Sequence, residues 1–296
     1  MTCRGMKSVF TGLAVILWLW LQVPGSSSQF LEEDCGIASL IQPKIIGGEP
    51  AGLGLHPWMA LLHTQTSFRC AGSLINHWFV LTAAHCFDNG VNYIVRLGEY
   101  DRDTTEDSAH KEYEVDRGFR HMYYDNKTYT HDIALLRLKM RVEYLHHIKP
   151  ICIFENSNMK WVTEEATWFT ATGWGLTSTE PFSRGSRVLQ KVKLNRRNQT
   201  ECAWVFVQRM TSQQICVGSE DRRLCQGDSG GPQGRMVRRK FGDEYRFVQM
   251  GIASYSGAGC PVSIITDVVS YGEWIKRIVD WNTPRDESLD SNLRLY

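Results

Sequence analysis

Eight cysteines, spread from position 35 to position 260, constrain the fold more than any other feature of this 296-residue sequence. An even number of cysteines in a secreted chain predicts four disulfide bonds, which tie distant segments together. A zinc site would instead need cysteines in close CxxC pairs, and the sequence contains no such pair. A ninth cysteine, Cys3, lies in a segment that we expect to be removed. The eight are Cys35, Cys70, Cys86, Cys152, Cys202, Cys216, Cys225 and Cys260.

The first 28 residues have the composition of a secretory signal peptide. Arg4 and Lys7 precede a mostly apolar run over 9–23, and PGSSS supplies small residues suited to cleavage. A membrane anchor is the alternative, but the run is shorter than the roughly 20 residues that a spanning helix needs. We therefore expect a secreted, extracellular protein with no membrane span.

The charge balance argues against nucleic acid as a partner. The chain has 33 basic and 32 acidic residues; without Arg4 and Lys7 the balance is 31 against 32, a net charge of −1. Apolar residues make up 43%, which is typical of a globular core. Two sequons, at Asn126 and Asn198, predict glycosylation on surface loops.

The sequence divides into four parts. After the signal peptide, residues 29–44 form a short segment without a clear period, which is too small to fold alone. Residues 45–281 form one globular domain, and 282–296 form a polar tail. Within the domain, short runs rich in β-branched and aromatic residues alternate with turns, which indicates an all-β barrel or sandwich. The expected strands are at 58–63, 71–76, 78–84, 93–98, 132–138, 167–175, 247–255 and 263–269, and helical spacing predicts a helix over 271–281.

Three separate motifs carry the parts of an activated nucleophile. His85 lies in LTAAHC, Asp132 in HDIALL and Ser229 in GDSGGP. A serine hydroxyl needs an adjacent base, and a neutral imidazole suits that task near neutral pH. A buried carboxylate can hold the imidazole in the required tautomer. The glycines around Ser229 allow a tight turn whose N–H groups converge on one point, where they can stabilise an oxyanion.

Each motif alone also fits an ordinary structural role, as a core histidine, a strand cap or a turn. Found together and in the order His, Asp, Ser, they resemble the chymotrypsin-like (trypsin-like) family of secreted serine proteases. The resemblance covers about residues 35–281, including IIGG, TGWG, GIASY and the terminal helix. It implies an all-β fold of two antiparallel six-stranded β-barrels with a C-terminal helix, and an active site in the cleft between the barrels.

The resemblance also implies residue roles. His85 would be the general base, Asp132 its orienting acid and Ser229 the nucleophile. The backbone N–H groups of Gly227 and Ser229 would form the oxyanion hole, and the hydroxyl of Ser254 would support the aspartate. The implied disulfides are Cys35–Cys152, Cys70–Cys86, Cys202–Cys216 and Cys225–Cys260, the first tying residues 29–44 to the protease body.

The PKIIGG stretch indicates a zymogen. We expect cleavage after Lys44 to create a cationic amine on Ile45, which in this family enters an apolar pocket and pairs with the residue matching Asp228. That pairing would order the loop that holds Gly227 and Ser229. In the opposing interpretation Lys44 is simply an exposed linker residue.

The specificity pocket departs from the family pattern. Arg223 stands six residues before the nucleophile, at the floor of the pocket, and Ser256 and Ser263 stand where glycine is common. A buried guanidinium without an anion is costly, so cleavage after Lys or Arg is not expected. Three outcomes remain: a preference for acidic side chains, a shallow apolar slot with Arg223 turned to solvent, or a blocked pocket with slow turnover. The ability of arginine to place its charged end in solvent favours the last two.

Two charged segments have competing interpretations. The acidic loop from Glu99 to Asp107 lies where some relatives bind calcium, although a solvated surface loop is the simpler interpretation. The basic run over 235–240 is interpreted as an exposed hairpin, with an anionic partner as the alternative.

These features predict a secreted serine endopeptidase that is activated by cleavage after Lys44. We expect no cofactor, apart from the calcium alternative near Glu99, and no preceding regulatory domain. Its expected partners are a protein or peptide substrate, an upstream activating protease and a protein inhibitor. The alternative is a protease-like regulatory or binding protein whose substrate pocket is impaired. An intact set of catalytic residues favours the enzyme, whereas Arg223, Ser256 and Ser263 favour the alternative.

Overall fold

A computed structural model describes residues 29–37, 49–104, 110–175, 185–219, 228–239, 244–257 and 262–284. Several predictions fall outside these residues. They concern the signal peptide over 1–28, the cleavage site at Lys44 and Ile45, the pocket residue Arg223, the oxyanion-hole residue Gly227, the pair Cys225 and Cys260, and most of the tail over 282–296.

The first half of the chain forms a closed six-stranded antiparallel barrel in the order β2-β3-β4-β7-β6-β5. The apolar runs of the sequence supply most of it, since β4 (FVLT) is buried at every position and β7 (ALLRL) at four of five. The strands are β2 (Met59–His63), β3 (Phe68–Leu74), β4 (Phe79–Thr82), β5 (Ile94–Leu97), β6 (Lys111–Arg120) and β7 (Ala134–Leu138).

The second half forms another closed antiparallel barrel, because β8 pairs with both β9 and β11 and so completes the ring β8-β9-β10-β13-β12-β11. A short strand, β1 (Glu49–Pro50), adds to the outside of β9. The strands of the ring are β8 (Trp168–Gly173), β9 (Gln190–Arg196), β10 (Gln214–Gly218), β11 (Pro232–Arg238), β12 (Tyr245–Ser256) and β13 (Ser263–Asp267).

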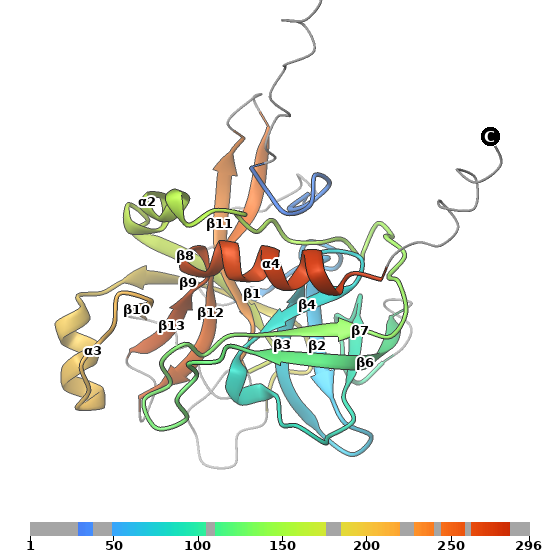
Figure 1. Ribbon diagram of the computed structural model, residues 1–296, viewed down its shortest axis with the longest axis horizontal. Helices are drawn as coiled ribbons and strands as arrows, with labels where there is room; N and C mark the ends of the chain where they lie inside the picture. Colours follow the sequence, from blue (N-terminus) through green and yellow to red (C-terminus); the bar gives the residue numbers. More distant parts are fainter. Residues whose placement is uncertain are drawn as a thin grey trace, which may run out of the picture.

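Among the described residues, the helices before the C-terminal end of the chain are few and short. The C-terminal α4 (Gly272–Asn282), preceded by the 3-10 turn η3 (Val268–Tyr271), turns Ile275 and Val279 into the core of the first barrel. In Figure 1, α4 runs from beside the second barrel, near β8 and β9, toward the first barrel near β4. The remaining helical segments are η1 (Ala84–Cys86), η2 (Ser157–Met159), α2 (Lys160–Glu164) and α3 (Gln199–Phe206). The prediction of two six-stranded barrels with a C-terminal helix is confirmed.

The segment before the expected cleavage site is fastened to the second half of the molecule. Cys35 is disulfide-bonded to Cys152, and the ring of Phe30, only 3% exposed, lies 5.3 Å from that of Phe154. Two further disulfides, Cys70–Cys86 and Cys202–Cys216, also match the implied pairing. Within the described residues, no helix has the length and apolar character needed to cross a membrane.

Candidate active site

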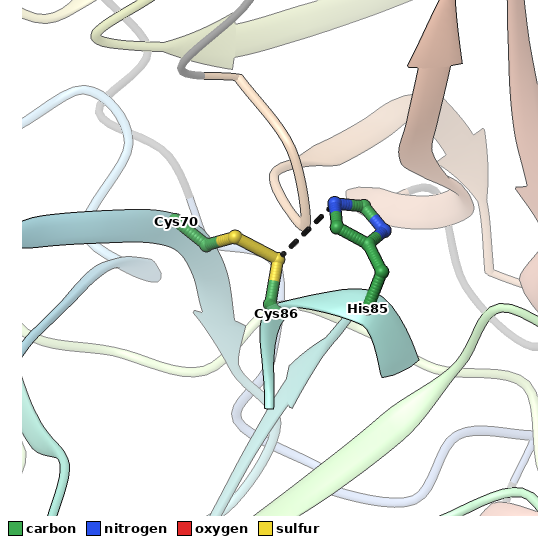
Figure 2. Close-up of side chains that lie close together, drawn as sticks. All are labelled: Cys70, His85 and Cys86. Carbon is green, nitrogen blue, oxygen red and sulfur yellow. Dashed lines mark hydrogen bonds between the residues drawn. A yellow bond between two sulfur atoms is a disulfide. The ribbon is translucent and has the colours of Figure 1, made fainter. Parts of the chain in front are cut away.

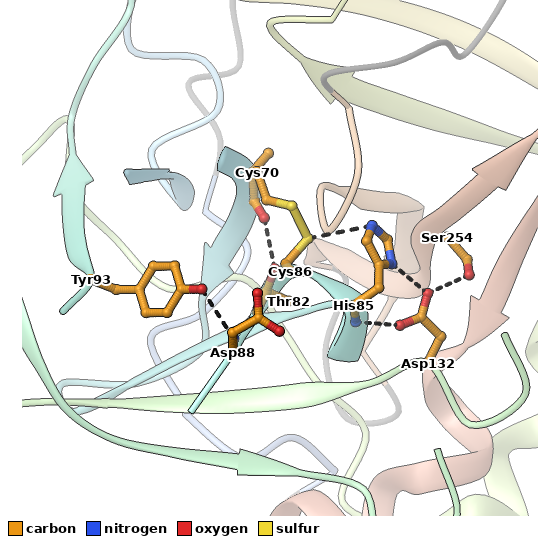
Figure 3. Close-up of a disulfide and its surroundings, with 9 residues drawn as sticks. Cys70, Thr82, His85, Cys86, Asp88, Tyr93, Asp132 and Ser254 are labelled. Carbon is orange, nitrogen blue, oxygen red and sulfur yellow. Dashed lines mark hydrogen bonds and ion pairs between the residues drawn. A yellow bond between two sulfur atoms is a disulfide. The ribbon is translucent and has the colours of Figure 1, made fainter. Parts of the chain in front are cut away.

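His85 and Asp132 are brought together by two adjacent elements of the first barrel. His85 lies in η1, directly after β4, and Asp132 lies two residues before β7, the strand that pairs with β4. The Nδ1 of His85 is 2.8 Å from Asp132 Oδ2, and its backbone N–H donates to Oδ1 at 2.9 Å. Figure 3 shows both contacts. Because the carboxylate holds the residue at two points, the imidazole ring is fixed in orientation and Nε2 is directed away from Asp132.

The second barrel completes the surroundings of Asp132, whose side chain is fully buried. The hydroxyl of Ser254, on β12, donates to Asp132 Oδ2 at 2.5 Å. Thr266, on β13, donates from its hydroxyl to the backbone carbonyl of Asp132 at 3.0 Å. A buried carboxylate must have its oxygens satisfied, so these bonds make the position of Asp132 depend on contact between the two barrels.

Ser229 lies at this same boundary, in the turn that leads into β11. Its carbonyl accepts a hydrogen bond of 2.8 Å from the N–H of Ala71 in the first barrel. The next residue, Gly230, has φ of 79°, and a Cβ there would overlap Thr82 Oγ1 and the Ala71 carbonyl. Glycine is therefore required for the turn to approach the first barrel this closely. Among the hydrogen bonds of the described residues, none joins Ser229 Oγ to His85 Nε2.

The disulfide between Cys70 and Cys86 packs against the imidazole ring of His85. Figure 2 shows His85 Nε2 directed toward Cys86 Sγ, at 3.6 Å. The three side chains could be mistaken for a metal site, since their ligand atoms lie within 4.8 Å of one another. The two sulfurs are bonded to each other and offer no thiolate, so this group forms a wall beside His85 and not a metal centre.

Asp228, the predicted partner of a new amine at Ile45, turns its carboxylate into the protein. It is 9% exposed, and its Oδ1 accepts a hydrogen bond of 2.9 Å from the N–H of Gly175. A Cβ at either Gly173 or Gly175 would overlap the carboxylate, so the TGWG segment makes room for it. Ile45 lies outside the described residues, so the amine–carboxylate pair stays a prediction.

The two serines of the predicted specificity pocket form a direct contact. Ser256 and Ser263 face each other across β12 and β13, and their hydroxyl oxygens are 2.9 Å apart. Two glycines at these positions would leave the expected specificity pocket open. Here two hydrogen-bonded serine side chains occupy that space. Arg223, the third unusual residue, lies outside the described residues.

Sequence reasoning missed an aromatic row beside His85. The ring of Tyr129 lies 5.6 Å from that of His85 and 4.9 Å from Tyr255, which in turn lies 4.7 Å from Phe206 of α3. Burial, reinforced by the charge of Asp132, raises the pKa of Tyr255 to about 12, so this ring stays neutral. No sequence motif marks Tyr129 as part of the site. Its place beside His85 becomes visible only when the loop before Asp132 is packed against β12 and α3.

The loop that carries Tyr129 has a strained backbone just before Asp132. Tyr129 and His131 have φ of 52° and 54°, in the left-handed region that non-glycine residues avoid. Each such residue costs about 1–2 kcal/mol, which the surrounding contacts must offset. One of these contacts is a hydrogen bond of 2.9 Å between the Tyr271 hydroxyl and His131 Nδ1.

The contacts of Glu99 do not favour calcium. Its buried carboxylate accepts from the Tyr100 N–H through Oε1 and from Arg96 through Oε2, both at 3.0 Å. His110 Nδ1 lies 3.7 Å from the same Oε2. Calcium needs six to eight oxygen ligands, whereas these partners present N–H groups and a fixed positive charge. Glu106 and Asp107 lie outside the described residues.

Both predicted glycosylation sites are exposed. Asn126 lies in the loop before Asp132, and Asn198 is the N-cap of α3, where its side-chain oxygen accepts from the Thr200 N–H at 3.0 Å. A glycan attaches to the amide nitrogen, which leaves this oxygen free to keep the cap.

Two closed antiparallel barrels with a histidine–aspartate pair at their boundary define the chymotrypsin fold. Comparison with known proteins agrees. The family profile described as Trypsin matches residues 45–275. The crystal structure of the Drosophila Grass clip serine protease of the Toll pathway superposes with a TM-score of 0.74 at 30% identity, covering 84% of this chain and 75% of that chain.

Curated relatives give the same result. Cathepsin G of Mus musculus is 35% identical over 82% of this chain and 88% of its own length. Serine protease grass of Drosophila melanogaster is 30% identical over 84% of this chain and 71% of its own. The suppressor of tumorigenicity 14 protein homolog of Bos taurus is 34% identical over 82% of this chain, which spans only 29% of that longer protein. The chain belongs to the trypsin-like serine protease family.

Proposed function

We propose that this protein is a secreted serine endopeptidase that becomes active after cleavage at Lys44. The observation that carries the proposal is the hydrogen-bonded series Ser254–Asp132–His85, which fixes an imidazole at the barrel boundary where the Ser229 turn is also anchored. In this proposal His85 takes the proton of the Ser229 hydroxyl as that oxygen attacks the scissile carbonyl. Asp132 stabilises the imidazolium that forms, and the N–H groups of Gly227 and Ser229 bind the oxyanion.

Activation would act through Asp228. Its buried carboxylate suits pairing with a cation that inserts into the protein interior. The proposed cation is the Ile45 amine, which exists only after the cut. The pairing would draw the loop of Gly227 and Ser229 into place, bringing Ser229 Oγ within reach of His85 Nε2.

The substrate proposal follows from the pocket. The contact between Ser256 and Ser263 would narrow the specificity pocket, and the positive guanidinium of Arg223 would repel cationic substrate side chains. Substrates are therefore peptides or proteins cleaved after residues other than Lys and Arg. Secretion, glycans at Asn126 and Asn198, an activating protease and an inhibitor belong to the same proposal.

The test uses the full-length chain expressed in secretory cells. Treatment with a trypsin-like activator should allow rapid labelling of wild type by a fluorophosphonate, and the label should be lost in Ser229→Ala. The Lys44→Gln variant should stay unlabelled after the same treatment. Rapid labelling of uncut Lys44→Gln would show that activation has another origin.

A mixed peptide library then tests the pocket. Activated wild type should cleave slowly or after non-basic residues, and Arg223→Asp should shift cleavage toward Lys and Arg. Strong cleavage after Lys or Arg by wild type would contradict the substrate proposal.

The Ser256–Ser263 contact also favours a second candidate, a protease-like regulatory protein whose substrate access is blocked. That protein would fold and undergo the cut after Lys44, yet it would cleave no member of the library. The Ser256→Gly/Ser263→Gly variant, with the wall reopened, would then gain activity that wild type lacks.

A further inference from the structure

The outer surface of the second barrel carries an unusual concentration of positive charge on three neighbouring strands. β9 holds Lys191, Lys193 and Arg196, and β11 holds Arg235 and Arg238, while β8 runs between them. These three strands contain no aspartate or glutamate. Arg196 is used internally, because its guanidinium donates to the carbonyls of Ala166 and Thr163. We call Trp168, Lys193 and Arg235, with the strand surface around them, the basic face.

An aromatic ring organises the centre of the basic face. The Nζ of Lys193 lies 5.1 Å from the centroid of the Trp168 ring, and the guanidinium carbon of Arg235 lies 5.3 Å from it. Cations at these distances are attracted to the π-system, so one indole holds two side chains in place across three strands. The ring carries no net charge, so these contacts do not neutralise the two positive charges.

Neither cation of the basic face has an acidic partner within the described residues. In the first barrel, by contrast, Arg96, Arg137 and Lys139 each contact a carboxylate at hydrogen-bond distance. Lys193 is exposed and Arg235 half-buried, so both charges can be reached from solvent. Two like charges held near one another without counter-ions raise the local potential and attract anions.

We propose that the basic face binds a sulfated polysaccharide. The cations stand on a flat sheet, at neighbouring positions across strands that lie about 4.8 Å apart, so a ligand must contact several of them along an extended path. A sulfated chain offers closely spaced anions for Lys193 and Arg235. Its sugar rings present C–H surfaces that pack against Trp168, and their hydroxyls can bond to Thr170, which lies directly opposite Lys193.

An acidic peptide fits this surface less well. Peptides that add to a sheet need an open strand edge, and β8 is hydrogen-bonded on both sides, to β9 and to β11. Without backbone bonds, an acidic peptide would depend on its side-chain charges alone, which are spaced more widely than the sulfates of a polysaccharide. The higher charge density decides in favour of the sulfated chain.

The basic face is separate from the candidate active site. β11 starts next to the Ser229 turn and runs outward, and the β11–β12 hairpin extends away from the body of the molecule in Figure 1. Within the described part of the chain, no hydrogen bond, ion pair or ring contact joins Lys193 or Arg235 to His85, Asp132 or Ser229. The inference does not depend on the proposed function, and a bound polysaccharide should leave hydrolysis of a short peptide unchanged.

The test measures binding of the full-length glycosylated protein to immobilised heparin, a sulfated polysaccharide, at about 0.15 M salt. Wild type should be retained, and Lys193→Gln/Arg235→Gln should bind at least ~10-fold more weakly and depend less steeply on salt, because about two fewer counter-ions are released. The matched control is Lys111→Gln/Arg117→Gln. It removes the same charge from exposed positions on β6 of the first barrel, where Arg117 also lies over a ring, that of Phe119, at 5.3 Å.

Three results would overturn the inference: wild type not retained on heparin, equal loss of binding in the control variant, or equal binding to chemically desulfated heparin. Tighter binding to polyglutamate or to phosphatidylserine vesicles than to heparin would assign the face to another partner and also reject it. The Lys193→Gln/Arg235→Gln variant should keep wild-type labelling by fluorophosphonate, which separates failure of this inference from failure of the proposed enzyme activity.

Discussion

The two barrels share an architecture but use their charged residues differently. In the first barrel the strand β6 carries an acid at every second position, Glu112, Glu114 and Asp116. These carboxylates pair with Arg96, Lys139 and Arg137 respectively. In the second barrel, Lys193 and Arg235 each lie over the ring of Trp168, and neither has a carboxylate partner among the described residues. The difference indicates that positive charge serves to hold the first barrel together, whereas on the second it remains available for a ligand. The candidate site needs both barrels, because the first supplies His85 and Asp132 and the second supplies Ser229 and Ser254.

The largest effect should come from the acid of the first barrel. Asp132→Asn keeps the size of the side chain but stabilises the wrong imidazole tautomer, so kcat of the activated enzyme should fall about 10⁴-fold, the loss known for this substitution in the family's own reference enzyme. The measurement is hydrolysis of the best library peptide, with unchanged Tm as the control for folding. A loss below ~10-fold would mean that His85 does not depend on Asp132.

Next in size is the ion pair of Glu99. Arg96→Gln leaves this buried carboxylate without its strongest partner, and the free energy of unfolding should fall by about 3 kcal/mol. Thermal unfolding checks this, with the exposed pair variant Lys139→Gln as a control that should leave Tm unchanged. If added calcium raises the Tm of wild type, the conclusion that the contacts of Glu99 do not favour calcium is wrong.

The loss of the hydrogen bond that Ser254, in the second barrel, donates to Asp132 should have a smaller effect than the two changes above. Ser254→Ala removes one hydrogen bond to a charged oxygen, worth about 1.5–3 kcal/mol, so kcat/KM should fall about 10- to 100-fold. Thr266→Val, which removes only the bond to the Asp132 carbonyl, serves as the isosteric comparison and should lose less. Equal losses in the two variants would indicate that both act by moving the loop and not through the carboxylate.

A pH effect should come from His56, which is buried edge-on against the stacked rings of Trp58 and Phe247. Burial lowers its pKa to about 3, well below the ordinary value of about 6.5. As pH falls below about 6.5 the unfolded chain gains a proton that the folded chain does not, so stability should decrease down to about pH 3. His56→Phe should flatten Tm against pH across this window. An unchanged slope would show that another group governs it.

The smallest effect is expected for the basic face. Lys193 and Arg235 have no ion pair to lose within the described part of the chain, only their two contacts with the Trp168 ring. Lys193→Gln/Arg235→Gln should therefore lower the free energy of unfolding by about 1 kcal/mol, because the loss of two solvent-accessible cation–π contacts is offset in part by relief of the repulsion between the cations. Thermal unfolding alongside Arg96→Gln provides the direct comparison of the two barrels. A loss as large as that of Arg96→Gln would mean that these cations also have a structural role.

Sequence patterns predicted most of the strands with apolar side chains, but missed the solvent-facing β6 and β9 and also β10 and β11, of which β10 is buried at every position. β4 and β7 stood out as apolar runs, but β6 has a single fully buried residue, Tyr113, and β9 likewise only Leu194. α3 escaped notice because its apolar residues do not lie on one side; Trp204 is 84% exposed. Such segments take their structure from the neighbours they pair with, which a local pattern does not record.

The candidate site shows the same limit. Motifs located His85, Asp132 and Ser229 because the chemistry requires those residue types in distinctive local sequences. Thr266 and Tyr129 carry no local signal, since their contacts arise only when strands and loops far apart in the chain are packed together. The calcium alternative near Glu99 considered acidic residues alone, and neither it nor the preferred solvated loop anticipated Arg96, three positions earlier, as the partner of this carboxylate.

The anchored segment over 29–37 has a consequence for how activation would be detected. With Cys35 bonded to Cys152, hydrolysis after Lys44 would release nothing from the oxidised protein. An intact-mass spectrum of the oxidised material would therefore gain one molecule of water, and the lighter and heavier fragments would separate only after treatment with a thiol.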